Sequence, residues 1–142
     1  FNRCAGFTEP VDHRQHITFF PPCYIMINTT VESTKEASEN KRAEFRIINA
    51  LVPETSGTTN YFWGLMRSFA LDDEELDTFA FEGNRFAFSE DLEIIEKQQE
   101  MWDTVPNAKP VPFPHDKGII QSGKLMDRLI EAEQAAGKIA AE

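Results

Sequence analysis

Asp91 is the residue whose type and position point most directly to chemistry. The stretch 72–102 is typical of one long helix, because its apolar residues recur at three- and four-residue steps. With about 100° of rotation per residue, Asp91 lies about 30° from the centre of this apolar stripe. A carboxylate on a stripe that faces the core must be neutralised, paired or bound to a metal. The stripe consists of Leu76, Phe79, Ala80, Ala87, Ile94, Ile95, Met101 and Trp102.

Two interpretations of Asp91 remain open on this pattern. As a metal ligand it is held rigidly by the helix, and the small residues Gly83 and Ala87 on the preceding turns leave room for a bound group. As a structural residue it pairs with a buried arginine such as Arg46 or Arg67, which is the commoner fate of a buried carboxylate. We expect Asp91 to face a cavity and to be less exposed than Glu96. An arginine or lysine contact without a cavity would favour the structural interpretation.

Other reactive side chains form no recognisable site. His13 and His16 lie at a predicted loop-to-strand junction, where a spacing of three places them on opposite faces, so we interpret both as exposed polar residues. Cys4 and Cys23 are too few for a disulfide scaffold and predict free thiols in a cytoplasmic protein. His115 falls in a proline-rich connector and is expected to be exposed. The sequence contains no Ser-His-Asp set, phosphate loop or dinucleotide fingerprint.

Composition limits the class of protein. The chain has 142 residues, 41% of them hydrophobic, which predicts one domain with a core. The net charge of -10 argues against nucleic acid and against an anionic membrane surface as partners. No apolar run approaches the roughly 20 residues that span a bilayer, and no signal-peptide pattern is present. Because the chain begins with Phe1, we expect a fragment, a processed chain or a shortened version of a longer protein.

The order of elements predicts an α+β fold. Residues 1–14 are polar and read as irregular, and β-like runs follow at 16–20, 24–31, 44–52 and 60–70. Short polar links between them favour an antiparallel meander. The long helix should start at an N-cap Asp72 with Glu75 completing a capping box, and Gly83 marks a kink or close packing. A connector over 105–118 and a final helix over 122–136 complete the chain.

Two segments in combination carry a family resemblance. The run PETSGTTNYFWGLMRSFALDD, followed by FSEDLEIIEKQQEMW, resembles the C-terminal catalytic region of Rieske non-haem iron oxygenases. The nearest branch is the vanillate O-demethylase type, and the likeness extends over about residues 10–134. It implies a helix-grip fold, in which an antiparallel sheet curves around a long helix with the substrate pocket between them.

The resemblance also implies cofactors and site residues. Such oxygenases hold mononuclear Fe(II) with two histidines and one carboxylate, and the carboxylate corresponds to Asp91. The neighbouring Glu90 lies about 70° from the stripe centre and is the poorer choice. Ile27, Asn49, Gly83 and Ala87 are candidates for the substrate pocket. For Asn49, a polar residue in an apolar strand, an outward-facing position is an equal alternative.

The family's His-ligand segment and the Cys and His ligands of its Rieske cluster have no counterpart here. We therefore expect residues 1–142 to form a single domain, the C-terminal part of an oxygenase catalytic domain. The mononuclear Fe(II) would take its His ligands from outside the chain, where the [2Fe-2S] Rieske cluster would also lie. The resemblance implies NAD(P)H as the electron source, a reductase or ferredoxin as partner, an aromatic small-molecule substrate that is demethylated or hydroxylated, and a homotrimer as the candidate assembly.

Two alternatives compete with this interpretation. A non-catalytic helix-grip module that binds an apolar ligand or serves oligomer assembly would share the same fold. An ordinary structural domain would have Asp91 in an ion pair.

Overall fold

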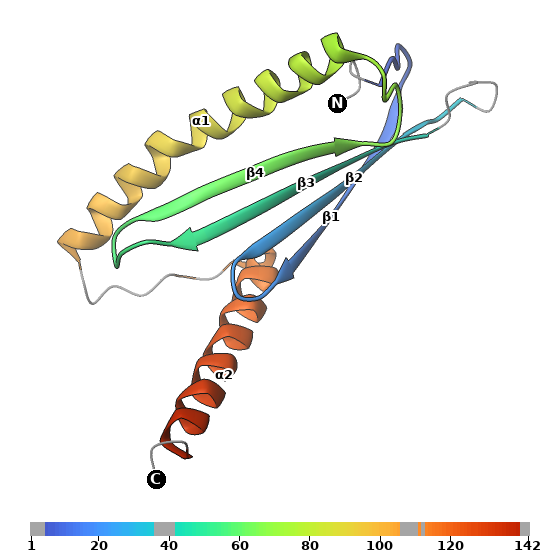
Figure 1. Ribbon diagram of the computed structural model, residues 1–142. Coiled ribbons are helices and arrows are strands. Elements are labelled where there is room, and N and C mark those ends of the chain that lie inside the picture. Colours follow the sequence, from blue (N-terminus) through green and yellow to red (C-terminus); the bar gives the residue numbers. More distant parts are fainter. Residues whose placement is uncertain (1–4, 36–41, 106–110, 112, 140–142) are drawn as a thin grey trace.

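The computed structural model describes residues 5–35, 42–105, 111 and 113–139. Within them lie four strands, two α-helices and one turn of 3-10 helix (Figure 1). The predicted α+β class and the pairing of an antiparallel sheet with a long helix are confirmed. In chain order the elements are β1 (Val11–Phe20), β2 (Tyr24–Ser33), β3 (Arg42–Pro53), β4 (Thr59–Arg67), α1 (Glu74–Thr104), η1 (Pro114–Asp116) and α2 (Lys117–Ile139).

The sheet is the antiparallel meander that the sequence predicts, with strand order β1-β2-β3-β4. The prediction that residues 1–14 are irregular is wrong from Val11 onward, because β1 starts there and pairs with the full length of β2. The polar segment 11–15 has no apolar alternation, so its strand character comes from this pairing with β2. The connection between β3 and β4 is a short turn closed by the Thr58 carbonyl, which accepts from the backbone N–H of Glu54 at 3.0 Å.

Helix α1 has the predicted length but a different start. Its N-cap is Asp73, whose side chain accepts a hydrogen bond from the backbone N–H of Leu76 at 2.9 Å. The predicted capping box of Asp72 and Glu75 is therefore wrong by one residue. Gly83 is exposed, and a Cβ at this position would have no heavy atom within 4 Å, so the expected close packing at Gly83 is also wrong.

Helix α2 starts five residues earlier than predicted. The proline at its leading end belongs to η1, where the Asp116 side chain accepts from the backbone N–H of Phe113 at 2.7 Å. Much of the predicted connector, 106–110 and 112, lies outside the described residues. Figure 1 shows α1 running beside β4, whereas α2 extends away from the sheet.

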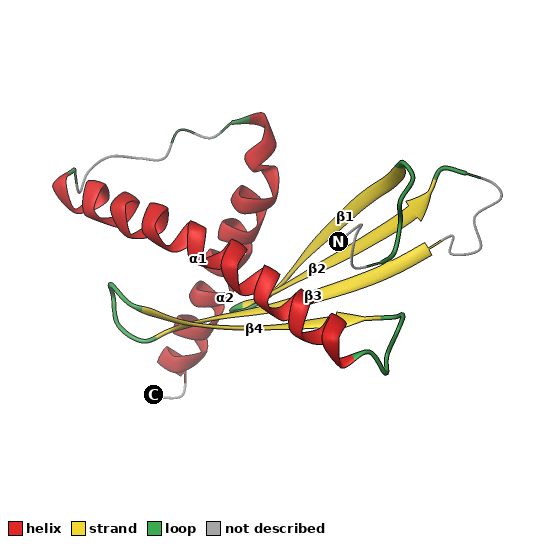
Figure 2. Ribbon diagram, turned by 90° about the horizontal axis from the view of Figure 1, so that it is seen from above, coloured by secondary structure: helices red, strands yellow, loops and turns green. Residues whose placement is uncertain are grey.

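The strand register assigns every side chain to one of two faces. Odd-numbered residues of all four strands share one face, because the pairs Ile25–Asn49 and Asn49–Trp63 connect them across the sheet. This is the face on which α1 lies, as the view from above shows (Figure 2). The main buried cluster sits at one end of it and contains Ala5, Phe7, Val31, Ala43 and Phe45.

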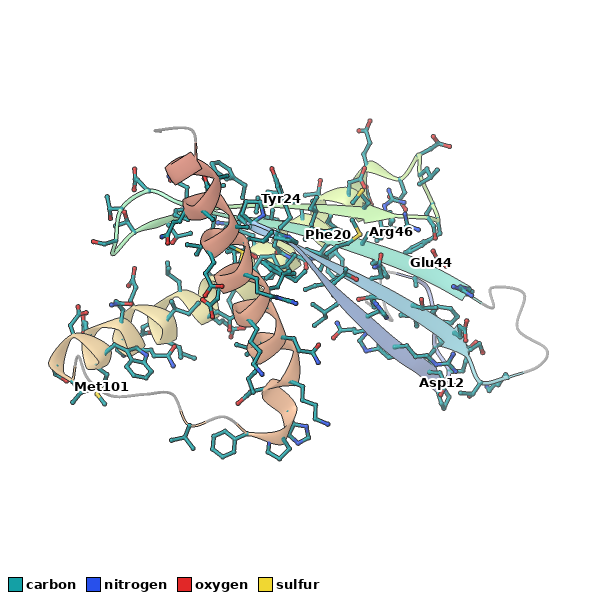
Figure 3. The ribbon with its side chains drawn as sticks, turned by 90° about the horizontal axis from the view of Figure 1, so that it is seen from below. Asp12, Phe20, Tyr24, Glu44, Arg46 and Met101 are labelled. Carbon is teal, nitrogen blue, oxygen red and sulfur yellow. The ribbon has the colours of Figure 1, made fainter. Side chains whose placement is uncertain are left out.

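The opposite face divides into a charged half and an apolar half (Figure 3). At the charged half, ion pairs cross the strands from Arg14 to Glu32 and from Arg42 to Glu32 and Glu44. At the apolar half, Phe20 and Tyr24 pair across the β1–β2 turn and are both exposed. Among the described residues, neither helix combines the length and the apolar composition needed to cross a lipid bilayer.

Candidate functional site

Aromatic rings join α1 to β4 and define the side of the helix that faces the sheet. The Phe81 ring stacks on Trp63 with centroids 4.9 Å apart, and Phe88 meets the edge of Trp63 at 5.2 Å. Phe88 also contacts the Tyr61 ring at 5.7 Å. Asp91 follows Phe88 by three residues, so helical periodicity places it on the same side of α1.

The negative charge of Asp91 acts on the Tyr61 hydroxyl, which lies on the facing strand β4. The pKa of the Tyr61 hydroxyl is raised above 10.0, first by partial burial and second by the negative charge of Asp91. Both effects disfavour the phenolate, which would be a second negative charge in a partly desolvated place. This coupling agrees with the position that the ring contacts give to Asp91.

One expectation for Asp91 is wrong, and the alternative interpretation is not supported either. The residue is exposed, as is Glu96, so it is not screened from bulk water in this structure. The proposed ion pair is absent as well, because Arg67 pairs with Asp77 at 2.9 Å and Arg46 approaches Glu44 at 3.9 Å. Among the described residues Asp91 has no ion-pair or hydrogen-bond partner, and its carboxylate is exposed to water.

Asn49 is a buried polar residue on the sheet face that α1 covers. It is 5% exposed, so the alternative that it points outward is wrong. Its amide nitrogen donates to the Ile25 carbonyl at 3.3 Å, and its amide oxygen accepts from the Tyr61 hydroxyl at 2.6 Å. The backbone carbonyl of Ile25 can only accept, so it fixes which end of the Asn49 amide faces Tyr61.

The predicted pocket residues fall into two groups. Ile27 lies on the same sheet face as Asn49, where it pairs with Ile47 in the register and is half-buried. Gly83 and Ala87 are exposed and lie about 140° and 100° around the helix from Phe88. The structure therefore places Asn49 and Ile27 on the sheet face that α1 covers. On α1, Ala87 lies one turn before Asp91 and about 40° from it, and Gly83 about 80° from it, so Ala87 shares the side of the helix that carries Asp91.

Sequence reasoning did not single out Tyr61, whose hydroxyl donates to Asn49. The available signal was the pairing of strands, since Trp63 is the register partner of Asn49 and Tyr61 lies two residues before it on the same face. The predicted helix stripe is confirmed only in part, since it includes the buried Ala80 and the half-buried Leu76 and Trp102 but omits two aromatic contact residues. The actual contact side contains Phe81 and Phe88, whereas Phe79 is 60% exposed.

The histidines behave as the sequence indicates. His13 and His16 are exposed and, three residues apart in β1, lie on opposite faces of the sheet. A groove of about 560 Å³ between β1 and α2 is lined in part by His16 and His115, and Asp91 is not among its lining residues. Within residues 5–35, 42–105, 111 and 113–139, no three His, Cys, Asp or Glu side chains gather closely enough to hold a metal ion.

Comparison with known proteins identifies the family. Residues 1–132 match the model of the vanillate O-demethylase oxygenase C-terminal domain. The chain belongs to this family. The resemblance that the two sequence segments indicate is thus confirmed, and it covers nearly the whole chain.

Curated relatives agree with this assignment. The chain is 34% identical over 131 residues to a vanillate O-demethylase oxygenase subunit of Pseudomonas sp. (strain ATCC 19151), covering 89% of this chain and 40% of the relative. It is 35% identical over 134 residues to the iron-sulfur subunit of a putative toluene-4-sulfonate monooxygenase system of Comamonas testosteroni, covering 91% and 39%. The chain thus spans about 40% of the length of these relatives. No solved structure matches it.

Proposed function

We propose that this chain is part of a Rieske-type oxygenase that acts on an aromatic substrate with O2, and that Asp91 is the carboxylate ligand of its mononuclear Fe(II). The observation that carries the proposal is the unpaired Asp91 carboxylate on the side of α1 that faces the Asn49–Tyr61 pair. A carboxylate left without a cation there is suited to a metal ion. Membership of the oxygenase family agrees with this role.

The described residues supply one of the three protein ligands that the expected iron site requires. Fe(II) in the 2-His-1-carboxylate arrangement takes one oxygen ligand and two imidazoles and keeps open positions where oxygen chemistry takes place. Asp91 would supply the oxygen ligand. Since the described residues contain no cluster of three ligating side chains, the two imidazoles would come from elsewhere in the natural protein.

An aromatic substrate suits the surroundings of Asp91. The rings of Trp63, Phe81 and Phe88 lie along one side of the space between α1 and β4, and Asn49 contributes a polar group to the sheet side. Aromatic side chains around a few fixed polar groups are typical of small-molecule sites. The relatives are named for vanillate and toluene-4-sulfonate, and both compounds are benzene derivatives.

The electron supply belongs to the same proposal. Two relatives are named as iron-sulfur subunits of monooxygenase systems. We infer that electrons from NAD(P)H reach the Fe(II) through a reductase or ferredoxin and a [2Fe-2S] Rieske cluster. The chain itself would contribute the sheet, α1 and one iron ligand.

The decisive experiment is iron content in the full-length natural protein. Asp91→Ala should reduce tightly bound mononuclear iron to near zero, because loss of a ligand leaves two imidazoles and no anionic donor. The circular dichroism spectrum should stay unchanged, since Asp91 makes no bond that supports the fold. Iron per chain close to that of the wild type in Asp91→Ala would remove Asp91 from the metal site.

Two matched controls sharpen this result. Glu96→Ala removes an exposed carboxylate five residues further along the same helix and should keep its iron. Glu90→Ala tests the neighbouring carboxylate and should also keep its iron. If Glu90→Ala loses iron and Asp91→Ala does not, the ligand assignment moves by one residue.

The structural-domain alternative is disfavoured by the contacts of Asp91. That interpretation requires an arginine or lysine at the carboxylate, and within the described part of the chain neither Arg46 nor Arg67 fills that role. The non-catalytic module shares the fold, and an exposed Asp91 solvated by water is compatible with it. Iron retention in the variants above separates it from the oxygenase.

A further inference from the structure

The donor and acceptor of each hydrogen bond at Asn49 are fixed by the protein. They determine whether the Tyr61 hydroxyl can donate to or accept from a bound ligand. The Ile25 carbonyl is an acceptor and therefore takes the Asn49 N–H, at 3.3 Å. The amide oxygen of Asn49 then points to Tyr61 and accepts its hydroxyl proton, at 2.6 Å. A hydroxyl has one proton to donate. With that proton committed to Asn49, the Tyr61 oxygen can only accept from a further partner.

Tyr61 is not enclosed by the described part of the protein. Tyr61 is 42% exposed, in contrast to Asn49, and its ring is held by the Phe88 edge. Among the described residues Asn49 is the hydrogen-bond partner of the Tyr61 hydroxyl. The chain therefore presents a fixed acceptor whose orientation is set by a buried amide.

The hydrogen bond that Tyr61 already donates favours a donor group over an anion at its oxygen. Asp91 is the charged residue that acts on Tyr61. In the described strands, Arg67 is the one Lys or Arg on the face toward α1, and its guanidinium is already paired with Asp77. An anionic substituent at this position would meet an oxygen that can only accept and would find no proton there, whether or not a metal ion is bound at Asp91.

We propose that Tyr61 is a specificity-determining residue that accepts a hydrogen bond from a hydroxyl group on the aromatic substrate, beside Asp91. This inference rests on the proposed function and deepens it. It assigns the substrate to the class of ring compounds with a free hydroxyl. Any carboxylate or sulfonate on the ring would then be directed away from the Tyr61 oxygen. The relatives' names leave this choice open, because vanillate carries a phenolic hydroxyl and toluene-4-sulfonate does not.

The test uses two probes that differ at one ring position, which carries a hydroxyl in one and a methoxy group in the other. Guaiacol has a hydroxyl next to a methoxy group, and veratrole has a second methoxy group in place of that hydroxyl. Binding of each to the iron-loaded full-length protein is measured by isothermal titration calorimetry without O2, so the readout is affinity and not turnover. The wild type should bind guaiacol about five-fold more tightly, the equivalent of one neutral hydrogen bond.

Tyr61→Phe removes the acceptor and keeps the ring. Its affinities for guaiacol and veratrole should become equal, mainly through weaker guaiacol binding. Tyr24→Phe is the matched control, because Tyr24 is the other tyrosine of the chain and lies on the opposite face of the sheet. This variant should keep the five-fold preference.

Asn49→Leu tests the direction of the hydrogen bond. Without the amide oxygen, the Tyr61 hydroxyl is free to donate to a methoxy oxygen, so veratrole should bind more tightly than it does to the wild type. Melting temperatures of all variants report whether the buried substitution disturbs the fold. If Asn49→Leu does not fold, the comparison of Tyr61→Phe with Tyr24→Phe decides the matter.

The outcomes separate this proposal from the function it rests on. Equal affinity of the wild type for both probes, no measurable binding of either, or a guaiacol preference that survives in Tyr61→Phe would overturn the role of Tyr61. All of these results are independent of the iron content of Asp91→Ala, which is the measurement that tests the oxygenase assignment. Retention of iron in Asp91→Ala with a preference lost in Tyr61→Phe would instead leave an aromatic-binding site without the proposed metal ligand.

Discussion

Arg67 joins the end of β4 to the start of α1, and its replacement by methionine should weaken the fold. The side chain is 6% exposed, and its guanidinium donates to the backbone carbonyls of Phe69, Ala70 and Asp73 and to the Asp77 carboxylate. Hydrogen bonds from a charged donor contribute about 1.5–3 kcal/mol each when buried. Methionine keeps most of the apolar stem and removes all of these donors.

The expected loss is smaller than the number of bonds implies. Asp77 is 64% exposed, so water solvates its carboxylate once Arg67 is gone, and that pair contributes less than about 1 kcal/mol. The Phe69 carbonyl is partly buried, whereas the Ala70 and Asp73 carbonyls are accessible to water. We therefore expect Arg67→Met to lower the free energy of unfolding by about 3 kcal/mol.

Urea unfolding followed by circular dichroism measures this change, with Arg46→Met as the control. Arg46 is 58% exposed and approaches a single carboxylate at 3.9 Å, so its loss should cost about 0.5 kcal/mol or less. A similar small change in both variants would refute the reasoning, because it would mean that the Arg67 hydrogen bonds do not hold the β4–α1 connection together.

Two further predictions concern the same connection and the site. Ala70 has a backbone φ of 46°, a left-handed conformation that costs a residue with a Cβ about 1 kcal/mol, so Ala70→Gly should raise the free energy of unfolding by roughly 0.5 kcal/mol in urea titrations; a decrease would contradict the strain. The raised pKa of Tyr61 means that the folded state holds the phenolic proton more tightly than the unfolded state. Its contribution to stability is complete below pH 10.0 and is lost as the pH rises through the folded-state pKa. In a Tyr24→Phe background, ultraviolet titration of the phenol should show a lower Tyr61 pKa when Asp91 is replaced by asparagine (Asp91→Asn) than when Asp91 is retained. An unchanged pKa would mean that Asp91 is too far from Tyr61 to affect its ionisation.

Local sequence signals were sufficient for the order of elements but not for the helix face. Alternating β-branched and aromatic residues predicted β2, β3 and β4, and the acidic first turn predicted the start of α1 to within one residue. The burial of α1 could not be predicted in the same way. Its apolar residues surround much of the helix, and the strand opposite selects which of them pack. Trp63 packs against Phe81 and Phe88, which the periodicity had not placed in the stripe.

The candidate site shows the same limit. The type of Asp91 and its position on a helix were informative, since the residue does lie on the side of α1 that faces the sheet. Its exposure was not predictable, because burial depends on what else covers the helix. Asn49 was recognisable as an unusual polar residue in a strand. Its partner Tyr61 became visible only through the register of β3 and β4.

Asp91 and several apolar residues near it are exposed on the same segment of α1. Ring contacts between α1 and the sheet end at Phe88 in the described residues, and beyond it Leu92, Ile94 and Ile95 are 56–68% exposed. Each square ångström of apolar surface left in water costs about 25 cal/mol, so this part of α1 is stabilised by any protein surface that covers it. Ile95 lies one turn after Asp91 on the same side of the helix. A surface that buries Ile95 therefore also removes water from Asp91, and there an unpaired carboxylate is stable only with a cation. Covering this segment and binding a metal ion at Asp91 are thus expected to be coupled, each favouring the other.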